Sequence, residues 1–409
     1  MSEIEPMNVD EKRKYLHKMR IRYWQAKDRR AKSALLDEMA AVSGLHRKSL
    51  IRLIKGELAR KPRRNQRGKI YGPDVQAVVE KIAHSLDYPC AERLQPNLVW
   101  LGKHLVAHGE LEVSEAVERK LETISVSTLK RMLPPVQQVA ERLAHQKGQS
   151  RGSYAQRQAI PIRRIAWNES VPGHLEIDLV HHCGASPSGQ YVHTLQATDI
   201  ATGWSECVAI LGRSYLVIQD GFQHLEQRLP FPILEVHSDN GSEFLNDPLL
   251  RFWRKRARPL DLSRSRPYAK NDNRFVEENN FSLVRAYLGY ERLDTVEHTR
   301  LLNQLYDQLW LYHNFFQPVM RLKEKLFERG YCKRIYDPAL PPLDRLLHAK
   351  ILPAYKQAQL LALRHSINPV QLRTHIHDLI DQISALPTAK GVAEDVRLTL
   401  FSPEAALAR

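Results

Sequence analysis

The hydrophobic pattern of this chain changes its period near residue 171, and no single regular architecture accommodates both patterns. Before that point apolar residues recur at helical spacing, as in Ser33–Ala41. After it, Leu175–Val180 alternates apolar and acidic residues, which is typical of a strand. Three strands, then helix, strand, helix, strand and helix are predicted up to residue 288. The chain is therefore expected to be multidomain: an all-α first part, an α/β domain with a mixed sheet, and a mostly helical end.

Positive charge is concentrated in the first part. Residues 1–170 carry 33 Lys and Arg against 19 Asp and Glu, whereas residues 171–409 carry 28 against 27. A net excess of this size in one part of the chain indicates a polyanionic partner, and nucleic acid is the commonest one. A surface that serves only solubility is the alternative interpretation.

Nothing in the sequence indicates secretion or a membrane. The four cysteines are scattered without a CxxC pair, so neither a disulfide framework nor a cysteine zinc site is expected. The N-terminus lacks the layout of a signal peptide, and no run approaches the roughly 18 apolar residues of a membrane span. We expect a cytoplasmic protein without a membrane partner.

Two short helices near the N-terminus are predicted to form a helix-turn-helix unit. Ser33–Ala41 is followed by a break at Val42–Gly44 and by a second helix, His46–Lys55, that Gly56 closes. In this motif the second helix enters the major groove. Its apolar side would bury Leu50, Ile51, Leu53 and Ile54, and its outward residues would contact DNA: Arg47, Lys48, Ser49 and Arg52. A helical hairpin without DNA recognition is the alternative.

Two further basic segments point to the same partner. Arg60–Lys69 has six basic residues in ten and is either a solvated linker or an arm along phosphates, with Arg63 and Arg64 as the expected contacts. Ser125–Leu133, which Pro134 and Pro135 terminate, also resembles a recognition helix, with Lys130 and Arg131 toward DNA. A plain helical bundle is the alternative for this second unit.

Three carboxylates stand out by position. Asp178 lies inside a strand between Ile177 and Leu179, where its burial is costly unless it is paired or binds a metal. Asp239 ends another strand, and strand C-termini are where α/β proteins place ligands. Glu277 lies near the start of a helix.

Carboxylates from three separate elements can hold two Mg²⁺ or Mn²⁺ ions about 4 Å apart. One ion activates a water or a DNA 3′-hydroxyl, and the other stabilises the leaving oxygen. Residues 171–250 contain ten acidic and two basic residues, so DNA would be repelled there without metal. Residues 251–285 contain ten basic against four acidic residues, and three of these cations are expected to contact the DNA backbone: Arg264, Arg266 and Lys270.

These motifs resemble the catalytic core of integrase-type DDE transposases of bacterial insertion sequences. The resemblance covers about residues 165–320 and rests on Leu-Glu-Ile-Asp at 175–178, His-Ser-Asp-Asn-Gly-Ser-Glu-Phe at 237–244, and the segment 265–279. It implies a ribonuclease-H-like fold and a triad of Asp178, Asp239 and Glu277 that binds two Mg²⁺ or Mn²⁺ ions. The separations of 61 and 38 residues agree, and the ten residues from Pro267 to the first Glu favour Glu277 over Glu278.

The chain departs from the family's common pattern at two positions. Arg274 replaces a common Gly, and Val284 occupies a position that often carries Lys or Arg, with Arg285 one residue further on as the expected DNA contact. Retroviral integrases carry an N-terminal His/Cys zinc module, and no segment of this sequence matches it. The two predicted helix-turn-helix units take its place, as in bacterial transposases.

The predicted segments and function follow from these observations. The resemblance implies an enzyme that binds the ends of its mobile element, cleaves the 3′ strands and joins them to target DNA as a homo-oligomer. A DNA-binding regulator with an inactive core and a metal-dependent nuclease without strand transfer are the alternatives. The predicted segments are a helix-turn-helix domain (1–58), a basic linker (59–72), a second helical DNA-binding domain (73–135), a linker (136–170), the catalytic core (171–320) and a helical region (321–409).

Several other residues have simpler interpretations. Asp199 is predicted to be a turn residue, and Glu243 to start a helix or support the site. A strand would direct His181 and His182 to opposite faces, which argues against a shared zinc ion. His237 is expected to be packed. The aromatic residues of a late helix are expected to be core rather than a base-stacking set: Trp310, Tyr312, Phe315 and Phe316.

Overall fold

The structure, a computed structural model, describes residues 7–56, 58, 70–133, 169–238, 253, 260–266, 273–328 and 331–389. The chain forms two compact units, Met1–Ile70 and Tyr71–Arg409. No helix among the described residues has both the length and the apolar character needed to cross a bilayer.

The first unit is a three-helix cluster. Its helices are α1 (Val9–Gln25), α2 (Arg29–Ser43) and α3 (Arg47–Lys55). Gly44 has a φ of +66° and ends α2, a backbone conformation that glycine adopts without strain and that lets α3 begin three residues later. The three helices share one small core, to which each contributes: Leu16, Met19, Leu36, Met39, Leu50 and Ile54.

The second unit begins with short helices, as the sequence predicts. They are α4 (Pro73–His84), α5 (Ala91–Leu94), the 3₁₀ turn η1 (Gln95–Asn97), α6 (Leu98–Ala107), α7 (Glu115–Thr123) and α8 (Val126–Met132). Ser114 and Ser125 accept hydrogen bonds from N3 backbone N–H groups and so start α7 and α8. These helices pack on the rest of the unit, where the Tyr312 hydroxyl donates to the carbonyl of Ser85 at 2.9 Å.

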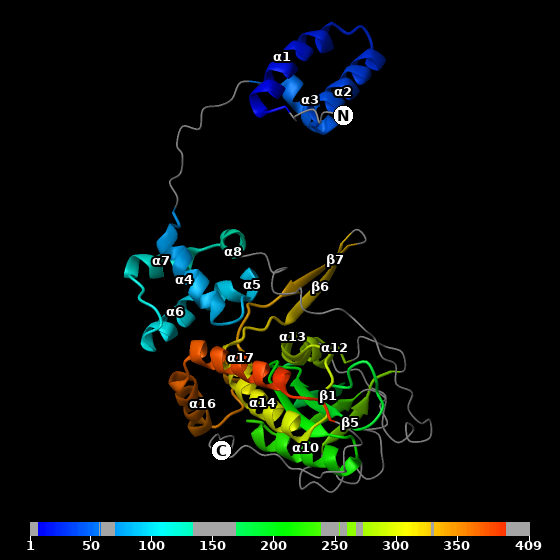
Figure 1. Cartoon of the computed structure of the whole chain (residues 1–409). Coiled ribbons are helices and arrows are strands. Elements are labelled where there is room, and N and C mark those ends of the chain that lie inside the picture. Colours follow the sequence, from blue (N-terminus) through cyan, green and yellow to red (C-terminus); the bar gives the residue numbers. More distant parts are fainter. Residues whose placement is uncertain are drawn as a thin grey trace. The chain divides into compact units, whose positions relative to one another are not determined.

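A mixed five-stranded sheet forms the centre of the second unit, in agreement with the predicted α/β domain (Figure 1). The strand order is β3-β2-β1-β4-β5. Strand β1 is antiparallel to β2 and parallel to β4; β2 and β3 are antiparallel, and β4 and β5 parallel. The bounds are β1 (His174–His181), β2 (Val192–Asp199), β3 (Ser205–Leu211), β4 (Glu235–Ser238) and β5 (Asp261–Arg264).

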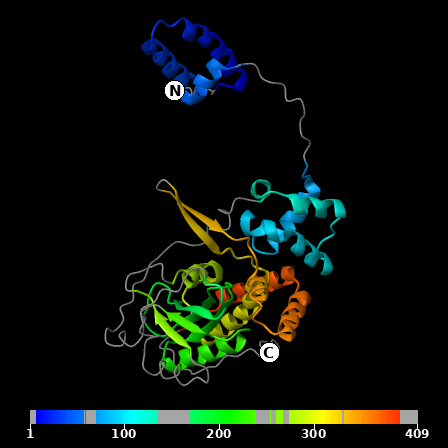
Figure 2. The same cartoon turned by 180° about the vertical axis from the view of Figure 1, so that it is seen from behind.

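Helix α10 (Tyr215–Arg228) covers one face of the sheet, as Figure 2 shows from behind. Its Gly221 approaches the sheet closely, because a Cβ there would lie 3.3 Å from Leu195 and 3.2 Å from Ile210. The helix buries Phe222 and Leu225 on this face. Apolar packing therefore fixes α10 on the sheet.

The long helix α14 (Val296–Phe316) seals the edge strand β3. The Asn303 side chain bonds both the N–H and the carbonyl of Ala209, and Asn314 does the same for Ser205. Edge strands expose unpaired backbone groups that invite aggregation, and these two amides satisfy those of Ala209 and Ser205. The aromatic residues of α14 are core, as predicted: Tyr312, Phe315 and Phe316 are buried and Trp310 is partly so.

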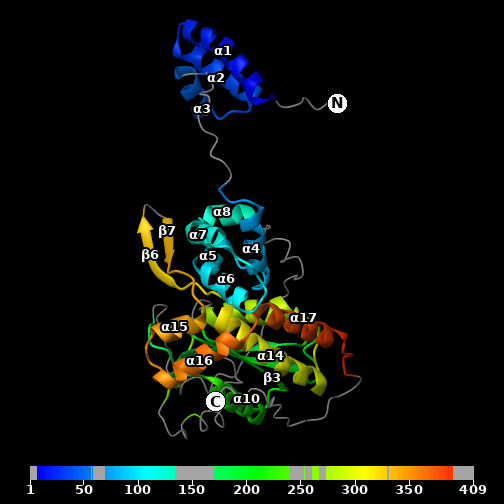
Figure 3. The ribbon, with the colours of Figure 1, turned by 90° about the vertical axis from the view of Figure 1, so that its left-hand side faces the viewer.

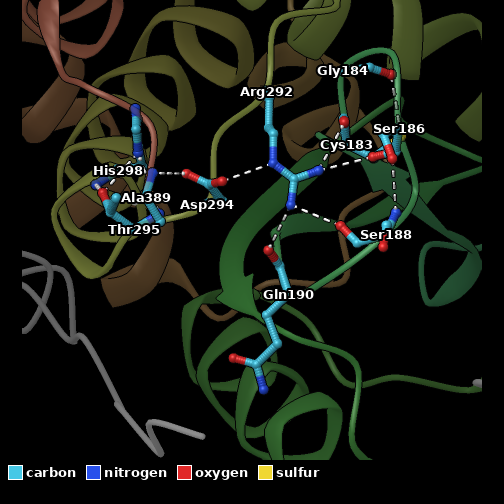
Figure 4. A network of polar contacts seen from close by, with 10 residues as sticks. All are labelled: Cys183, Gly184, Ser186, Ser188, Gln190, Arg292, Asp294, Thr295, His298 and Ala389. Atoms are coloured by element: carbon cyan, nitrogen blue, oxygen red, sulfur yellow. Dashed lines mark hydrogen bonds and ion pairs between the residues drawn. The ribbon is translucent and has the colours of Figure 1, made fainter. Parts of the chain in front are cut away.

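Arg292 ties the loop between β1 and β2 to the segment that leads into α14 (Figure 4). Its Nε donates to Asp294 at 2.7 Å, and Asp294 accepts the N–H of Ala389. The remaining donors of the guanidinium reach four carbonyls of the loop: Cys183, Ser186, Ser188 and Gln190. This side chain thus fixes the connection that follows the strand carrying Asp178.

The C-terminal region is mostly helical, as predicted, with one exception. Its helices are α15 (Pro342–His348), α16 (Ala354–Ser366) and α17 (Pro369–Ala385). Where helix was expected, β6 (Leu322–Glu328) and β7 (Tyr331–Tyr336) form an antiparallel hairpin. Charged residues are consecutive in this segment, at Lys323–Lys325 and again at Lys333 and Arg334, so the strands show no regular alternation of apolar and polar residues.

Candidate active site

Asp178 lies in the middle strand of the sheet with its side chain half-buried. Its Oδ2 accepts a hydrogen bond from the Asn280 side chain at 2.6 Å, and its Oδ1 accepts the N–H of Leu179 at 2.8 Å. Alternate residues of a strand share a face, so Asp178 and Glu176 project from the same side of β1. The predicted strand carboxylate is thus hydrogen-bonded to the segment that follows Glu277.

Glu176 fixes a short helix on this face of the sheet. Its Oε2 accepts the backbone N–H groups of Phe275 at 2.8 Å and Val276 at 3.0 Å, at the start of α12 (Arg274–Asn279). Burial raises the pKa of Glu176 to about 7, and the two N–H donors oppose that rise. A carboxylate at a helix N-terminus stabilises the helix there, so Glu176 holds α12 against β1.

The last residue of α12 is also hydrogen-bonded to the sheet. The Asn279 side chain donates to Thr198 of β2 at 3.0 Å and to Ser205 of β3 at 2.9 Å. The chain then makes a π-helical turn, η3 (Asn280–Arg285), before α13 (Ala286–Leu288). Single π-turns inside helices occur frequently at functional sites. Here the turn begins at Asn280, the residue that contacts Asp178.

Glu277 is exposed on α12, on the helix that Glu176 and Asn279 attach beside Asp178. Its neighbour Glu278 is also exposed but lies 3.4 Å from Arg93 in an ion pair. Successive helical residues point about 100° apart. The two carboxylates therefore face different surroundings, and Glu278 faces helix α5.

A buried polar network runs along the same face at β4 and β5. The Ser263 hydroxyl donates to Glu235 at 2.6 Å and contacts His237 Nδ1 at 2.7 Å. His174 bonds the other oxygen of Glu235 at 2.8 Å, and this hydrogen bond raises the pKa of His174. His237 is fully buried, in agreement with the prediction that it is packed. The network supports the C-terminal end of β4.

Asp239 lies outside the described residues. Strand β4 ends one residue earlier at Ser238, whose register partner on β1 is Ile177, the neighbour of Asp178. Among the described residues no group of three or more His, Cys, Asp or Glu side chains is arranged to hold a metal ion. Glu243, Lys270, Arg63 and Arg64 also lie outside the described residues.

The predicted DNA contacts on the helices α3 and α8 differ in their surroundings. Lys48 and Arg52 are exposed on α3, and Ser49 is half-buried. Arg47 instead pairs with Asp37 and donates to the carbonyl of Ser33, so it ties α3 to α2. On α8, Lys130 pairs with Glu92, and Arg131 is exposed and bonds the carbonyl of Ser127.

The predicted DNA contacts near the candidate site also differ in exposure and in hydrogen bonding. Arg266 is exposed, whereas Arg264 is only 7% exposed, so its guanidinium is not at the surface in this arrangement. Arg285 donates to the carbonyls of His181 at 2.7 Å and Gly289 at 3.1 Å, and burial lowers its pKa. Both Arg264 and Arg285 would have to change their contacts to reach DNA.

The remaining candidate residues are packed or hydrogen-bonded within the fold. His182 is buried and bonds Thr194, while His181 points to the other face. Asp199 ends β2 and accepts the N–H groups of Gly173 and Thr202, as expected of a turn residue. Glu176, Asn279 and Asn280 were not anticipated. The available signal was their position, within two or three residues of Asp178 or Glu277.

Comparison with known proteins identifies a relative over most of the chain. No family model matches the sequence. The chain is 36% identical over 326 residues to the uncharacterized protein y4rM of Sinorhizobium fredii (strain NBRC 101917 / NGR234), covering 80% of this chain and 92% of that protein. The protein belongs to the same family as y4rM.

Two solved structures show a weak likeness. One is the catalytic core domain of BIV integrase, with 18% identity, a TM-score of 0.28, and coverage of 44% of this chain and 95% of that chain. The other is the simian T-cell lymphotropic virus intasome in complex with PP2A regulatory subunit B56 gamma, with 16% identity, a TM-score of 0.25, and coverage of 45% and 59%. TM-scores this low do not establish a common fold.

Proposed function

We propose that the protein is a DNA transposase with a ribonuclease-H-like core. It binds the ends of its mobile element, cleaves the 3′ strands and joins them to target DNA by metal-dependent transesterification. The observation that carries the proposal is the attachment of α12 to β1. Glu176 and Asn280 bring the strand that carries Asp178 and the helix that carries Glu277 to one face of the sheet.

Asp239 completes the proposed triad through chain connectivity. Consecutive Cα atoms are about 3.8 Å apart, and Asp239 follows Ser238, which pairs with the neighbour of Asp178. The buried network of Glu235, Ser263 and His237 supports the strand from which Asp239 continues. All three carboxylates therefore belong to the polar face of the sheet in this proposal.

An oxygen-only donor set of this kind fits Mg²⁺ or Mn²⁺. Asp178, Asp239 and Glu277 would hold two such ions, which when bound activate the attacking oxygen and stabilise the leaving oxygen. Asn280 orients the Asp178 carboxylate by donating to its Oδ2. Glu176 positions Glu277 by fixing the first turn of α12, since it accepts two backbone N–H groups there.

DNA recognition is assigned to the basic first part of the chain and to cations near the site. Lys48, Ser49 and Arg52 of α3 would read the element end in a helix-turn-helix arrangement, with α8 as the second reader. A homo-oligomer would pair two ends. The other proposed backbone contacts are Arg63, Arg64, Lys130, Arg131, Arg266 and Lys270, and, after a change of partner, Arg47, Arg264 and Arg285.

A joining assay tests this function. Matched inverted repeats in the DNA that flanks the gene identify the substrate, which is supplied pre-cut with Mg²⁺ and target plasmid. We expect joined product from the wild-type chain, and Asp239→Asn should abolish cleavage and joining while DNA binding persists. Cleavage without any joined product would make the protein a nuclease, and binding without either step would make it a regulator.

A further inference from the structure

The β6–β7 hairpin, Leu322–Glu328 paired with Tyr331–Tyr336, is an exposed arm of the second unit (Figure 3). Two aromatic rings at its far end are open to solvent: Phe327 is 77% exposed and Tyr331 is 82% exposed. Large exposed rings on a narrow two-stranded ribbon find no core to enter. The arm therefore presents a surface to another molecule.

The two strands of the arm carry more positive than negative charge, with four Lys and Arg residues against Glu324 and Glu328. Lys325 lies directly opposite Arg334 in the antiparallel register, and like charges in this position destabilise a sheet. Lys323 and Lys333 add two more cations. Within the part of the chain that the structure describes, none of these four side chains is ion-paired. Such a cluster indicates that the partner is an anion.

The arm is held firmly at its root, although an isolated two-stranded hairpin is only marginally stable in water. Asp337 accepts the N–H of Arg321 at 2.7 Å, and Arg345 bonds both oxygens of Asp337, at 2.6 and 3.0 Å. The Arg345 side chain also reaches the carbonyl of Val319. The arm thus leaves the core in a defined direction.

The root also contacts the helix that carries Glu277. The guanidinium carbon of Arg321 lies 4.2 Å from the ring centroid of Phe275, in the first turn of α12. Phe275 in turn donates its backbone N–H to Glu176. A polyanion that reaches Glu277 therefore approaches the surface from which the arm begins.

We propose that the arm binds the phosphate backbone of duplex DNA beside the active site. Its four cations contact phosphates, and Phe327 and Tyr331 contact the groove at its end, as exposed apolar rings do in proteins that bend DNA. The assignment rests on the proposed function. A second copy of the chain is the less favoured partner, because two arms in a symmetric pair would bring like charges together.

The test measures affinity for a fluorescein-labelled duplex of random sequence over a range of salt concentrations, with the full-length chain. K325Q/R334Q should reduce the slope of log K against log salt by about 2 and the low-salt affinity by roughly tenfold. R300Q/K356Q, which removes the same charge from α14 and α16, is the matched control and should change neither. E324Q, which removes an exposed acid from the arm, should strengthen binding.

Unfolding does not explain the expected loss. K325Q/R334Q relieves a like-charge pair, so its melting temperature should equal or exceed that of the wild type. Unchanged binding by K325Q/R334Q, or an equal loss in the control, would overturn the proposal. A change in sedimentation without a change in DNA affinity would assign the arm to a second copy and would equally overturn it.

The proposal for the arm and the proposed catalytic function can be contradicted independently of each other. If the wild type joins pre-cut ends and K325Q/R334Q binds DNA normally, the arm is wrong and the function stands. If the wild type never cleaves or joins DNA while K325Q/R334Q still loses affinity selectively, the function is wrong and the arm stands as a DNA contact.

Discussion

The two faces of the five-stranded sheet are both covered, but they differ in how many carboxylates they carry. The face toward α10 is largely apolar, with Leu195 and Ile210 packed around Gly221, and its buried carboxylate, Glu206, is paired with Arg228 of α10. The other face carries Glu176, Asp178 and Glu235. Burying apolar groups stabilises a fold, whereas burying carboxylates costs free energy unless they are hydrogen-bonded. Carboxylate burial on the polar face therefore costs stability that its hydrogen bonds must offset, whereas apolar burial under α10 stabilises the fold.

The largest expected effect is catalytic and confined to the polar face. Asp178→Asn and Glu277→Gln should each reduce joining by about 10³-fold or more, because each removes a charge from the proposed metal ligands. The free energy of unfolding should change by about 1 kcal/mol or less. Parallel joining assays and urea unfolding check this. If these variants retained joining but lost much of their unfolding free energy, the carboxylates would stabilise the fold and would not be catalytic.

A substitution in the apolar packing between α10 and the sheet should instead reduce stability. Phe222 is 1% exposed on the buried side of α10, and Phe222→Ala should cost about 3–5 kcal/mol of unfolding free energy through the cavity that it leaves. Urea unfolding followed by circular dichroism measures the loss. A cost below about 1 kcal/mol would show that α10 is not fixed by this packing.

A smaller loss is expected from the hydrogen-bond network of the polar face. Ser263→Ala removes the partner that Glu235 and His237 share, and should cost about 1–3 kcal/mol because both groups stay buried. Ser366→Ala, at an exposed serine that bonds Leu363, is the matched control and should be nearly neutral. Equal effects of the two changes would contradict the network.

The smallest effect separates the two adjacent glutamates. Glu278 forms an exposed ion pair with Arg93, and such pairs contribute about 0–1 kcal/mol. Glu278→Gln should therefore leave the rate of joining within about twofold of the wild-type rate. A twofold change corresponds to about 0.4 kcal/mol of activation free energy. If Glu278→Gln abolishes joining and Glu277→Gln does not, the spacing argument selected the wrong residue.

Several elements of the fold could be predicted from the sequence. Alternation in Leu175–Val180 indicated β1, and helical spacing indicated α2 and α3. The arm was missed because Lys and Glu beside apolar residues suit a helix as well as an exposed ribbon. The role of Glu176 was missed because its partner, Phe275, lies 99 residues away. The pairing of Arg47 with Asp37 was hidden because a helix pattern shows which side faces outward, but not which neighbour lies there.

The most direct test of the central claim locates the metal. Crystals of the full-length chain with a pre-cut DNA end and Mn²⁺ are measured at the manganese absorption edge. The account predicts two anomalous peaks about 3.5–4 Å apart between the carboxylates of Asp178, Asp239 and Glu277. Anomalous peaks only at other residues, in crystals that contain the DNA end, would contradict it.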